Sequence, residues 1–187
     1  MQKVAPLQTH TPIEADAETY AVRRAREEDL NCLPAIERRA GQLFADAGLE
    51  NVANNEPVSQ EYLLSFLNGG AVHVAVDHAD KPVGFALTGL LDGACHLYEL
   101  SVDPDHGRRG LGARLVTAGC VYAQDMGCRA MTLSTFLDLP WNGPFYNKLG
   151  FNDMARAAWT PGLHLLYLRE IDIELPVKRR GFMRKDF

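Results

Sequence analysis

The chain has 187 residues, of which 47% are hydrophobic, and this is enough for one substantial domain but short for two. The 24 acidic and 19 basic residues give a formal net charge of −5, which argues against a dedicated nucleic-acid-binding protein, because such proteins normally carry a basic surplus. No run of about 18 apolar residues occurs, so we expect no membrane-spanning helix and no membrane partner.

Residues 1–19 contain prolines and acids but no basic segment followed by an apolar core, so we expect a flexible N-terminal segment, not a secretory signal, and a cytoplasmic protein. The spacing of the four cysteines fits neither a zinc site nor a C-x-x-C redox pair. We therefore expect reduced, packed thiols and no metal site at Cys32, Cys95, Cys120 and Cys128.

The first predicted elements are a short strand beginning at Tyr20 and a helix from about Glu28 to Ala47, with acids at its start and Gly48 after its end. The asparagine-rich segment Glu50 to Pro57 is predicted to be a loop. Ser59-Gln-Glu then opens a second helix, which ends at Asn68-Gly-Gly.

Three strands are predicted next, from Ala71 to Val76, Pro82 to Leu91, and Ala94 to Val102. The turn signals between them are so short that the strands must form an antiparallel meander. Apolar residues then recur three or four apart from Leu111 to Met126, which predicts a third helix.

Beyond Gly127 we expect a strand at 129–135, a short helix at 141–149, and strands at 151–158 and 164–174. This order predicts one α+β domain over residues 20–175, with a mixed, mostly antiparallel sheet of six or seven strands flanked by about four helices. Residues 176–187 are expected to be a basic C-terminal tail, because Val177 to Phe187 holds five basic residues and one acid. The rest of the chain is therefore more acidic than the net charge suggests.

A glycine-rich helix start follows the third strand of the meander. The segment from Leu100 runs through Asp103-Pro-Asp-His into Gly-Arg-Arg-Gly-Leu-Gly-Ala-Arg. Unpaired backbone N–H groups and the helix dipole meet at such a junction, so it suits a phosphate or pyrophosphate. It lacks the Gly-Lys-Ser/Thr of a P-loop, and the hairpin connections before it argue against a dinucleotide-binding fold.

The segment Arg109-Gly110-Leu111-Gly112 resembles the loop Gln/Arg-x-x-Gly-x-Gly/Ala of the GNAT acyltransferase superfamily. One departure is that Gly107 stands where that family usually carries Arg or Gln, while Arg108 stands where Gly is often found. A second segment, Pro144-Phe-Tyr-Asn-Lys-Leu-Gly-Phe151, is similar to the late helix-to-strand signature of the same family. The resemblance covers roughly residues 20–174.

The resemblance implies acetyl transfer from acetyl-CoA, and a sheet that splays open between the strand ending at Val102 and the strand at 129–135. The pantetheine arm would lie in the gap, paired with backbone groups of Leu100 and Val102, and the pyrophosphate would lie at the helix start. Asn142 begins the late helix in a way that departs from the family, and is a further candidate contact. The expected cofactor-binding residues are Leu100, Ser101, Val102, Arg108, Arg109, Gly110, Leu111, Gly112, Ala113, Arg114 and Asn142.

Acyl transfer to an amine needs a group that removes a proton from the ammonium. Glu99 is the first candidate because it interrupts an apolar run just before the cofactor segment. Strand alternation turns it away from Tyr98, Leu100 and Val102 unless a bulge intervenes, so His96, Tyr98 or a water molecule remain alternatives.

Tyr146 matches the family position whose phenol protonates the departing thiolate, a role suited to a side chain that stays protonated at neutral pH. Ser134 and Thr135 would lie on the opposite lip of the gap, where they could bind the acceptor, order water or merely fill a strand. The acceptor pocket corresponds to about Gln42 to Phe66, with candidate residues Phe44, Glu50, Asn54, Asn55, Glu56 and Tyr62.

We therefore predict an N-acetyltransferase that transfers an acetyl group to the primary amine of a small molecule, by direct attack in a ternary complex. A non-catalytic coenzyme A-binding module is the alternative from another class. Within the enzyme class, the acceptor could instead be a protein amino terminus or a lysine. A homodimer is possible, and the basic C-terminal segment could help to close it.

Overall fold

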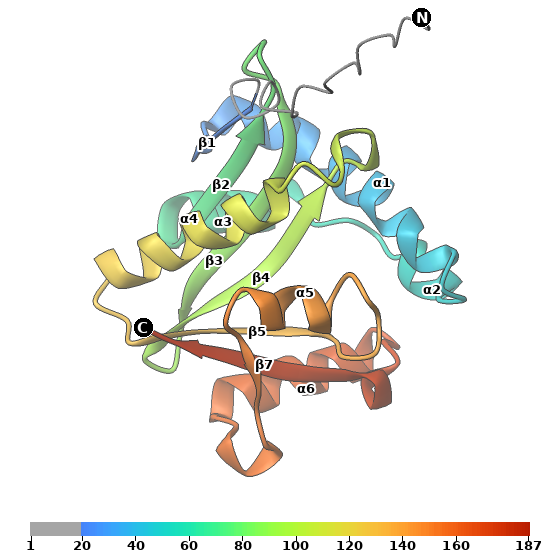
Figure 1. Ribbon diagram of the computed structural model, residues 1–187, viewed down its shortest axis with the longest axis vertical. Coiled ribbons are helices and arrows are strands. Elements are labelled where there is room, and N and C mark those ends of the chain that lie inside the picture. The colour runs from blue at the N-terminus through green and yellow to red at the C-terminus, as the bar shows by residue number, and fades with distance from the viewer. Residues whose placement is uncertain (1–19) are drawn as a thin grey trace, which may run out of the picture.

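The computed structural model describes residues 20–187, so the predicted N-terminal segment at 1–19 lies outside the described residues. These residues form a seven-stranded sheet in the order β1-β2-β3-β4-β5-β7-β6 (Figure 1). Every neighbouring pair is antiparallel except β4 and β5, which are parallel. The prediction of an α+β fold with a mixed, mostly antiparallel sheet is confirmed.

The strands are β1 (Ala21–Arg24), β2 (Ala71–Val76), β3 (Pro82–Leu91), β4 (Ala94–Val102), β5 (Ala130–Phe136), β6 (Asn152–Asp153) and β7 (Arg180–Asp186). The α-helices are α1 (Leu33–Ala45), α2 (Glu50–Ala53), α3 (Gln60–Gly69), α4 (Leu111–Asp125), α5 (Gly143–Lys148) and α6 (Pro161–Asp172). Short 3-10 helices lie at Glu27–Cys32, Pro104–His106, Arg156–Ala158 and Val177–Arg179.

The predicted meander is confirmed at all three strands. Every residue of β2 is buried, and this strand pairs with β3 on one side and β1 on the other. The turn between β3 and β4 is as tight as expected, because Asp92 and Gly93 both adopt positive φ angles, of 49° and 80°. Ser59 caps α3 by accepting a hydrogen bond from the Tyr62 N–H at 3.1 Å, as its sequence predicts.

Helices cover both faces of the sheet (Figure 1). On one face, α4 buries Leu115, Val116 and Cys120 in a core shared with the middle strands and with Tyr146 and Phe151. On the other face, α1 and α3 pack their apolar sides against β2 and β3. The residues of this second core include Leu33, Ile36, Leu63, Phe66, Val72, Val74, Phe85 and Leu87.

The sheet splays between β4 and β5. These two strands pair only at Cys95 to Leu97 with Met131 to Leu133, although each continues for several residues beyond. Figure 1 shows them side by side at their amino ends and diverging toward their carboxyl ends. The main-chain groups on the β5 side of Tyr98 to Val102 consequently have no strand partner. The expected splay of the sheet is confirmed.

Two helices were not predicted. The segment at 164–174, predicted as a strand, belongs to α6, which begins after Thr160 with Pro161 in its first turn, a position that favours proline. The predicted loop after Glu50 contains the four-residue helix α2. The predicted strand at 151–158 is also mostly irregular, since only Asn152–Asp153 pairs with the sheet.

The expected basic tail is instead strand β7, which lies between β5 and β6. Phe182 and Met183 are buried, and the basic side chains around them find partners. Lys185 Nζ donates to the Leu149 carbonyl at 2.8 Å, and Arg180 donates to Glu170 at 2.9 Å. Backbone pairing with β5 along its whole length thus makes a charged segment part of the sheet.

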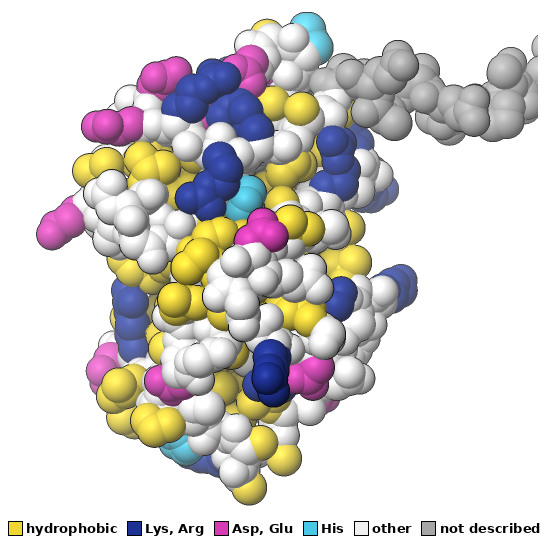
Figure 2. Space-filling model, turned by 90° about the vertical axis from the view of Figure 1, so that its left-hand side faces the viewer, with side chains coloured by type: hydrophobic (Ala, Val, Ile, Leu, Met, Phe, Trp, Pro, Cys, Tyr) yellow, Lys and Arg dark blue, Asp and Glu magenta, His cyan; other side chains and the backbone are white. Residues whose placement is uncertain are grey.

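The edge strand β1 is held by ion pairs. Arg23 donates to Asp29 at 2.7 Å and to Asp80 at 2.8 Å, which joins β1 to the following turn and to the β2–β3 connection. Figure 2 shows basic and acidic side chains next to one another at the top of the face in view, with no continuous patch of one sign. No helix within residues 20–187 is long and apolar enough to cross a membrane.

Candidate active site

A β-bulge lies where β4 leaves β5. Leu87 of β3 pairs with Glu99, and the next residue, Thr88, pairs with Leu97, so Tyr98 is an extra residue in β4. The bulge shifts the alternation of side chains. Leu100 packs in the core beneath α4, whereas Glu99 lies opposite Leu87, on the face covered by α1 and α3. Glu99 therefore lies on the same face as Tyr98. Regular strand alternation would have placed these two neighbours on opposite faces, and the bulge removes that difficulty.

Glu99 is held at the apex of the splay. Its carboxylate accepts a hydrogen bond from the Ser101 hydroxyl at 2.8 Å. Burial raises the pKa of Glu99 above its ordinary value, while Ser101, the Leu100 N–H and the charge of Arg180 oppose that rise. A carboxylate with a raised pKa is a stronger base than a surface glutamate, which suits proton removal from an amine.

Glu37 of α1 is a second carboxylate near the apex, and the sequence analysis missed it. Its Oε2 accepts a hydrogen bond from the Val58 N–H at 2.9 Å. Burial and the charge of Glu99 raise the pKa of Glu37 to about 8. Two such carboxylates resist ionising together. The available signal was helical spacing, since Glu37 lies one turn after Leu33, on the buried side of an amphipathic helix.

Tyr146 approaches the apex from the opposite face. Its ring is only 8% exposed and packs against Phe145 and Phe151, at centroid distances of 5.0 and 5.9 Å. Burial raises the pKa of its phenol, and the charge of Glu99 raises it further, so the hydroxyl stays protonated at neutral pH. The structure thus brings together the two residues that the sequence analysis named as candidate base and acid.

The two rival side chains are engaged elsewhere. His96 is buried, its Nδ1 hydrogen-bonds the Thr132 hydroxyl at 2.8 Å, and burial lowers its pKa to about 3, which keeps the ring neutral. Tyr98 packs its ring on Phe66 at 5.0 Å, and burial raises its pKa to about 12. Both side chains are therefore held by packing and hydrogen bonds with their neighbours.

The opposite lip of the gap carries a polar cluster. Ser134 is the first residue of β5 beyond the paired segment, and its hydroxyl donates to Glu170 at 2.5 Å. Arg180 donates to both Ser134 and Glu170 and stacks on Phe136, with its guanidinium carbon 4.8 Å from the ring centroid. Thr135 is buried within β5. The lip thus presents a charged cluster where the sequence suggested only hydroxyl groups.

The glycine-rich segment forms the start of α4 as expected. Gly110 is the N-cap, with a φ of 75°, and no side chain caps the free N–H groups of the first turn. Arg108 also takes a positive φ, of 58°, which explains why glycine suits that position. Asp103, which follows β4, is buried and forms an ion pair with Arg39 of α1. The free N–H groups remain available to an anion.

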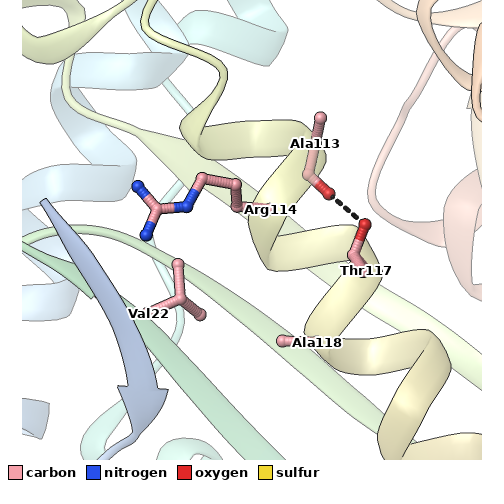
Figure 3. Close-up of a pocket in the computed structure, with 5 residues that line it drawn as sticks. All are labelled: Val22, Ala113, Arg114, Thr117 and Ala118. Atoms are coloured by element: carbon pink, nitrogen blue, oxygen red, sulfur yellow. Dashed lines mark hydrogen bonds between the residues drawn. The ribbon is translucent and has the colours of Figure 1, made fainter. Parts of the chain in front are cut away.

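Two of the three loop arginines contact Tyr20. Arg109 lies over its ring at 5.6 Å, and Arg114 Nη2 donates to its carbonyl oxygen at 2.9 Å. In Figure 3, Arg114 extends from α4 toward β1 and lies above Val22. A shallow depression along this side of α4 is lined by Val22, Ala113, Arg114, Thr117 and Ala118. Arg114 therefore extends toward β1, and Arg108, like the other two arginines, is exposed beside the helix start.

The remaining cofactor candidates surround the same helix start. A Cβ added at Gly112 would lie 3.4 Å from Phe145 and 3.9 Å from Leu100, so a small residue here lets α4, α5 and β4 approach. Leu111 is buried. Val102 is half-buried against the core beneath α4. Asn142 precedes α5, and its carbonyl accepts the Tyr146 N–H at 3.0 Å.

Only some of the residues expected to line the acceptor pocket lie near Glu99. Tyr62 lies close enough to Glu37, Glu99 and Arg169 to feel their charges, and burial raises its pKa. Phe44 packs on Phe136, at 5.4 Å between ring centroids. The four polar candidates from α2 and the segment after it are exposed: Glu50, Asn54, Asn55 and Glu56. Within residues 20–187, no cluster of three or more His, Cys, Asp or Glu residues could hold a metal ion.

A mixed sheet that opens next to a glycine-rich helix start defines the architecture of GNAT acyltransferases. The sequence profile of the acetyltransferase (GNAT) family matches residues 41–151, more than half of the chain. The chain therefore belongs to this family.

Solved structures share the fold at low sequence identity. PaiA N-acetyltransferase from Thermoplasma acidophilum, in complex with coenzyme A, is 16% identical, with a TM-score of 0.65 over 90% of this chain and 99% of its own. A GCN5-related N-acetyltransferase from Rhodopseudomonas palustris is 22% identical, with a TM-score of 0.64 over 96% of this chain and 100% of its own. A ribosomal-protein-alanine N-acetyltransferase from Escherichia coli is 20% identical, with a TM-score of 0.61 over 89% of this chain and 93% of its own.

Proposed function

We propose that this chain transfers the acetyl group of acetyl-CoA to the primary amine of a small molecule, by direct attack in a ternary complex. The observation that carries the proposal is the apex of the splay. There Glu99, turned by the bulge, and the protonated phenol of Tyr146 approach one gap from opposite faces. Such a pair can accept a proton from an amine and donate one to a thiolate.

The residues around the gap fit acetyl-CoA. The pyrophosphate would bind the uncapped N–H groups after Gly110, with Arg108 beside it. The pantetheine amides would pair with the main-chain groups of Leu100 and Val102 that face β5. Binding through main-chain groups depends little on side-chain identity, so the departure at Gly107 does not argue against the site.

The reaction then needs three proton transfers. Glu99, directly or through a water molecule, removes a proton from the ammonium, and the neutral nitrogen attacks the thioester carbonyl carbon. The tetrahedral intermediate collapses as the carbon–sulfur bond breaks, and Tyr146 donates its proton to the departing thiolate. The second proton of the attacking nitrogen restores the phenol, which gives an N-acetylated amine and free coenzyme A. No bond to the enzyme forms.

The charge around the apex supports a cationic acceptor. Glu37 and Glu99 lie on the face covered by α1 and α3, beside Tyr62, and the single negative charge that they share would attract an ammonium group. A protein amino terminus or lysine is the alternative acceptor. One solved structure of similar fold is a ribosomal-protein-alanine N-acetyltransferase, which is why this alternative is retained. A non-catalytic coenzyme A-binding module is the alternative outside the enzyme class.

The test measures free thiol released from acetyl-CoA across a panel of small amines, amino acids and peptides. Calorimetry measures acetyl-CoA binding in parallel. Release with a small amine, lost in Glu99→Gln, supports the proposal. Release with peptides alone selects the protein acceptor, and tight binding without release over the panel selects the non-catalytic module. Failure to bind acetyl-CoA would overturn the proposal entirely.

A further inference from the structure

Arg180 is a buried cation beside the apex of the splay. It begins β7, pairs with Phe136 at the end of β5, and stacks on that ring at 4.8 Å. Its Nη2 donates to Glu170 of α6 at 2.9 Å and to Ser134 at 3.2 Å. The side chains of Arg180 and Glu170 are only 14% and 12% exposed. The guanidinium is thus fixed by three neighbours on the lip of the gap.

The strand register places this cluster next to Glu99. Leu97 and Leu133 are the last paired residues, so Tyr98 and Ser134 face each other across the opening of the gap. Ser134 lies two residues after Thr132, whose hydroxyl hydrogen-bonds His96, so the two β5 side chains point to the same face of the sheet. Because of the bulge, Glu99 points to that face as well. The charge of Glu99 raises the pKa of both Glu37 and Tyr146, and the charge of Arg180 opposes the rise at Glu99 and at Tyr146. Ser101 donates to Glu99, and Glu170 is paired with Arg180. Tyr62 lies within reach of the charges of Glu37, Glu99 and Arg169.

Stability alone does not account for this ion pair. Burying two charges costs about as much as their attraction returns, and apolar replacements of such pairs are often neutral or stabilising. Arg180 also leaves its Nε buried without a partner in the described part of the chain, which adds a further cost. A cation kept at this cost beside Glu99 calls for a role in the ionisation of that carboxylate.

We propose that Arg180 is a positioning residue for the acetyl transfer, held by Glu170 and Ser134 so that its fixed positive charge lies beside the gap and stabilises the ionised form of Glu99. The inference rests on the proposed function, because it assigns Glu99 the role of base. Arg180 does not touch the reacting atoms. Its charge opposes the rise in the pKa of Glu99 that burial causes.

Two variants that break the same ion pair test the inference, because they change the charge in opposite directions. Arg180→Gln removes the cation and leaves Glu170, so the pKa of Glu99 should rise by about one unit. Glu170→Gln frees the cation, so the pKa of Glu99 should fall or stay unchanged. If the ion pair of Arg180 and Glu170 served only to stabilise the fold, breaking it from either side should change the pKa of Glu99 in the same way.

Two readouts follow the pKa of Glu99. The first is the acid limb of the pH profile for kcat/KM, and the second is NMR titration of glutamate labelled at its carboxyl carbon, with the Glu99 signal assigned by Glu99→Gln. A rise of the Glu99 pKa in Arg180→Gln, with a fall or no change in Glu170→Gln and with Arg180→Lys close to wild type, supports the inference. A rise in both variants, or no rise in a folded Arg180→Gln, overturns it.

The NMR readout also separates the two proposals. If the wild type releases no thiol with any acceptor, the proposed function fails, while the titration still shows whether Arg180 controls Glu99. If the wild type is active but the Glu99 titration ignores Arg180, only the inference fails. Circular dichroism of each variant establishes folding, and Arg180→Lys supplies a folded comparison if Arg180→Gln unfolds.

Discussion

Leu97 of β4 and Leu133 of β5 form the last parallel pair before the two strands separate. The next residue of β4, Tyr98, is the extra residue of the bulge. The loss of pairing and the change of alternation therefore occur at the same step. One inserted residue both opens the gap and turns Glu99 toward α1, which links the architecture of the sheet to the chemistry proposed for it.

Tyr146→Phe is expected to lower kcat about 100-fold and to leave the affinity for acetyl-CoA nearly unchanged, because it removes the proton donor and keeps the buried ring. Stopped-flow thiol release and calorimetry measure the two quantities. Tyr122→Phe, on α4 with its ring against Arg24, is the matched control and should behave as wild type. Unchanged turnover in Tyr146→Phe would disprove the assignment of the acid.

The two buried carboxylates should make the protein less stable as pH rises. The raised pKa of Glu37, about 8, means that the folded state keeps a proton which the unfolded chain, with a value near 4.5, has lost. The free energy of unfolding therefore declines from about pH 5 to about pH 8, by several kcal/mol, because each pH unit in this range contributes about 1.4 kcal/mol. Urea denaturation over this range measures the decline.

Glu37→Gln should flatten that pH dependence, because the amide resembles the protonated acid and cannot ionise. Glu56→Gln is the control, since Glu56 is 94% exposed and should leave the slope unchanged. The two variants have the same chemical change, so the comparison isolates burial. An equal pH dependence in Glu37→Gln and wild type would show that Glu37 does not retain its proton on folding.

Two substitutions at Arg108 distinguish the effect of backbone strain from the effect of the lost charge. With a φ of 58°, Arg108 pays for a left-handed conformation that glycine adopts freely, so Arg108→Gly should be about 1 kcal/mol more stable than Arg108→Ala. Both variants lose the guanidinium, and we expect each to bind acetyl-CoA about tenfold more weakly, with less dependence on salt. Wild-type affinity in both would remove Arg108 from the cofactor site.

Gly110→Ala should destabilise the protein by about 1 kcal/mol and weaken acetyl-CoA binding, because Gly110 caps α4 with a φ of 75° although its added Cβ would meet no atom. Gly69→Ala is the control. Its Cβ also lies in open space, but the backbone there is ordinary helix at the end of α3, so alanine should be neutral or stabilising. Chemical denaturation compares them, and equal stability changes would contradict the strain argument.

Local patterns were sufficient where neighbouring residues in the chain decide the structure. The turn at Asp92-Gly93 joined two strands, and Ser59 capped its helix, because both depend on nearby backbone groups. Local patterns failed where a partner far away in the chain decides the structure. Five basic side chains suggested a tail, yet Arg180 and Lys185 find acceptors on α6 and after α5, and β5 supplies the pairing that makes the segment a strand.

The prediction of a strand at 164–174, where the structure has α6, failed for a related reason. Leu165, Leu168 and Ile171 are 68%, 53% and 44% exposed, so its apolar residues do not mark one buried stripe in the sequence. The better signal was Thr160-Pro161, an N-cap residue followed by a proline in the first turn. Glu37 was missed similarly, because nothing local shows that its helix packs over the bulge.

The sequence by itself determined the meander, the uncapped glycine-rich start of α4 and the identities of Glu99 and Tyr146 as candidate base and acid. The meander and the helix start follow from short-range alternation and turn chemistry, Glu99 follows from its place in an apolar run, and the role of Tyr146 is what the resemblance to the GNAT family implies. Only the tertiary structure decided that Tyr98 bulges, that Glu99 lies near Glu37, and that Arg180 of β7 pairs with Glu170 of α6. Strand register and the charge around a buried group arise from segments far apart in the chain, which no local pattern records.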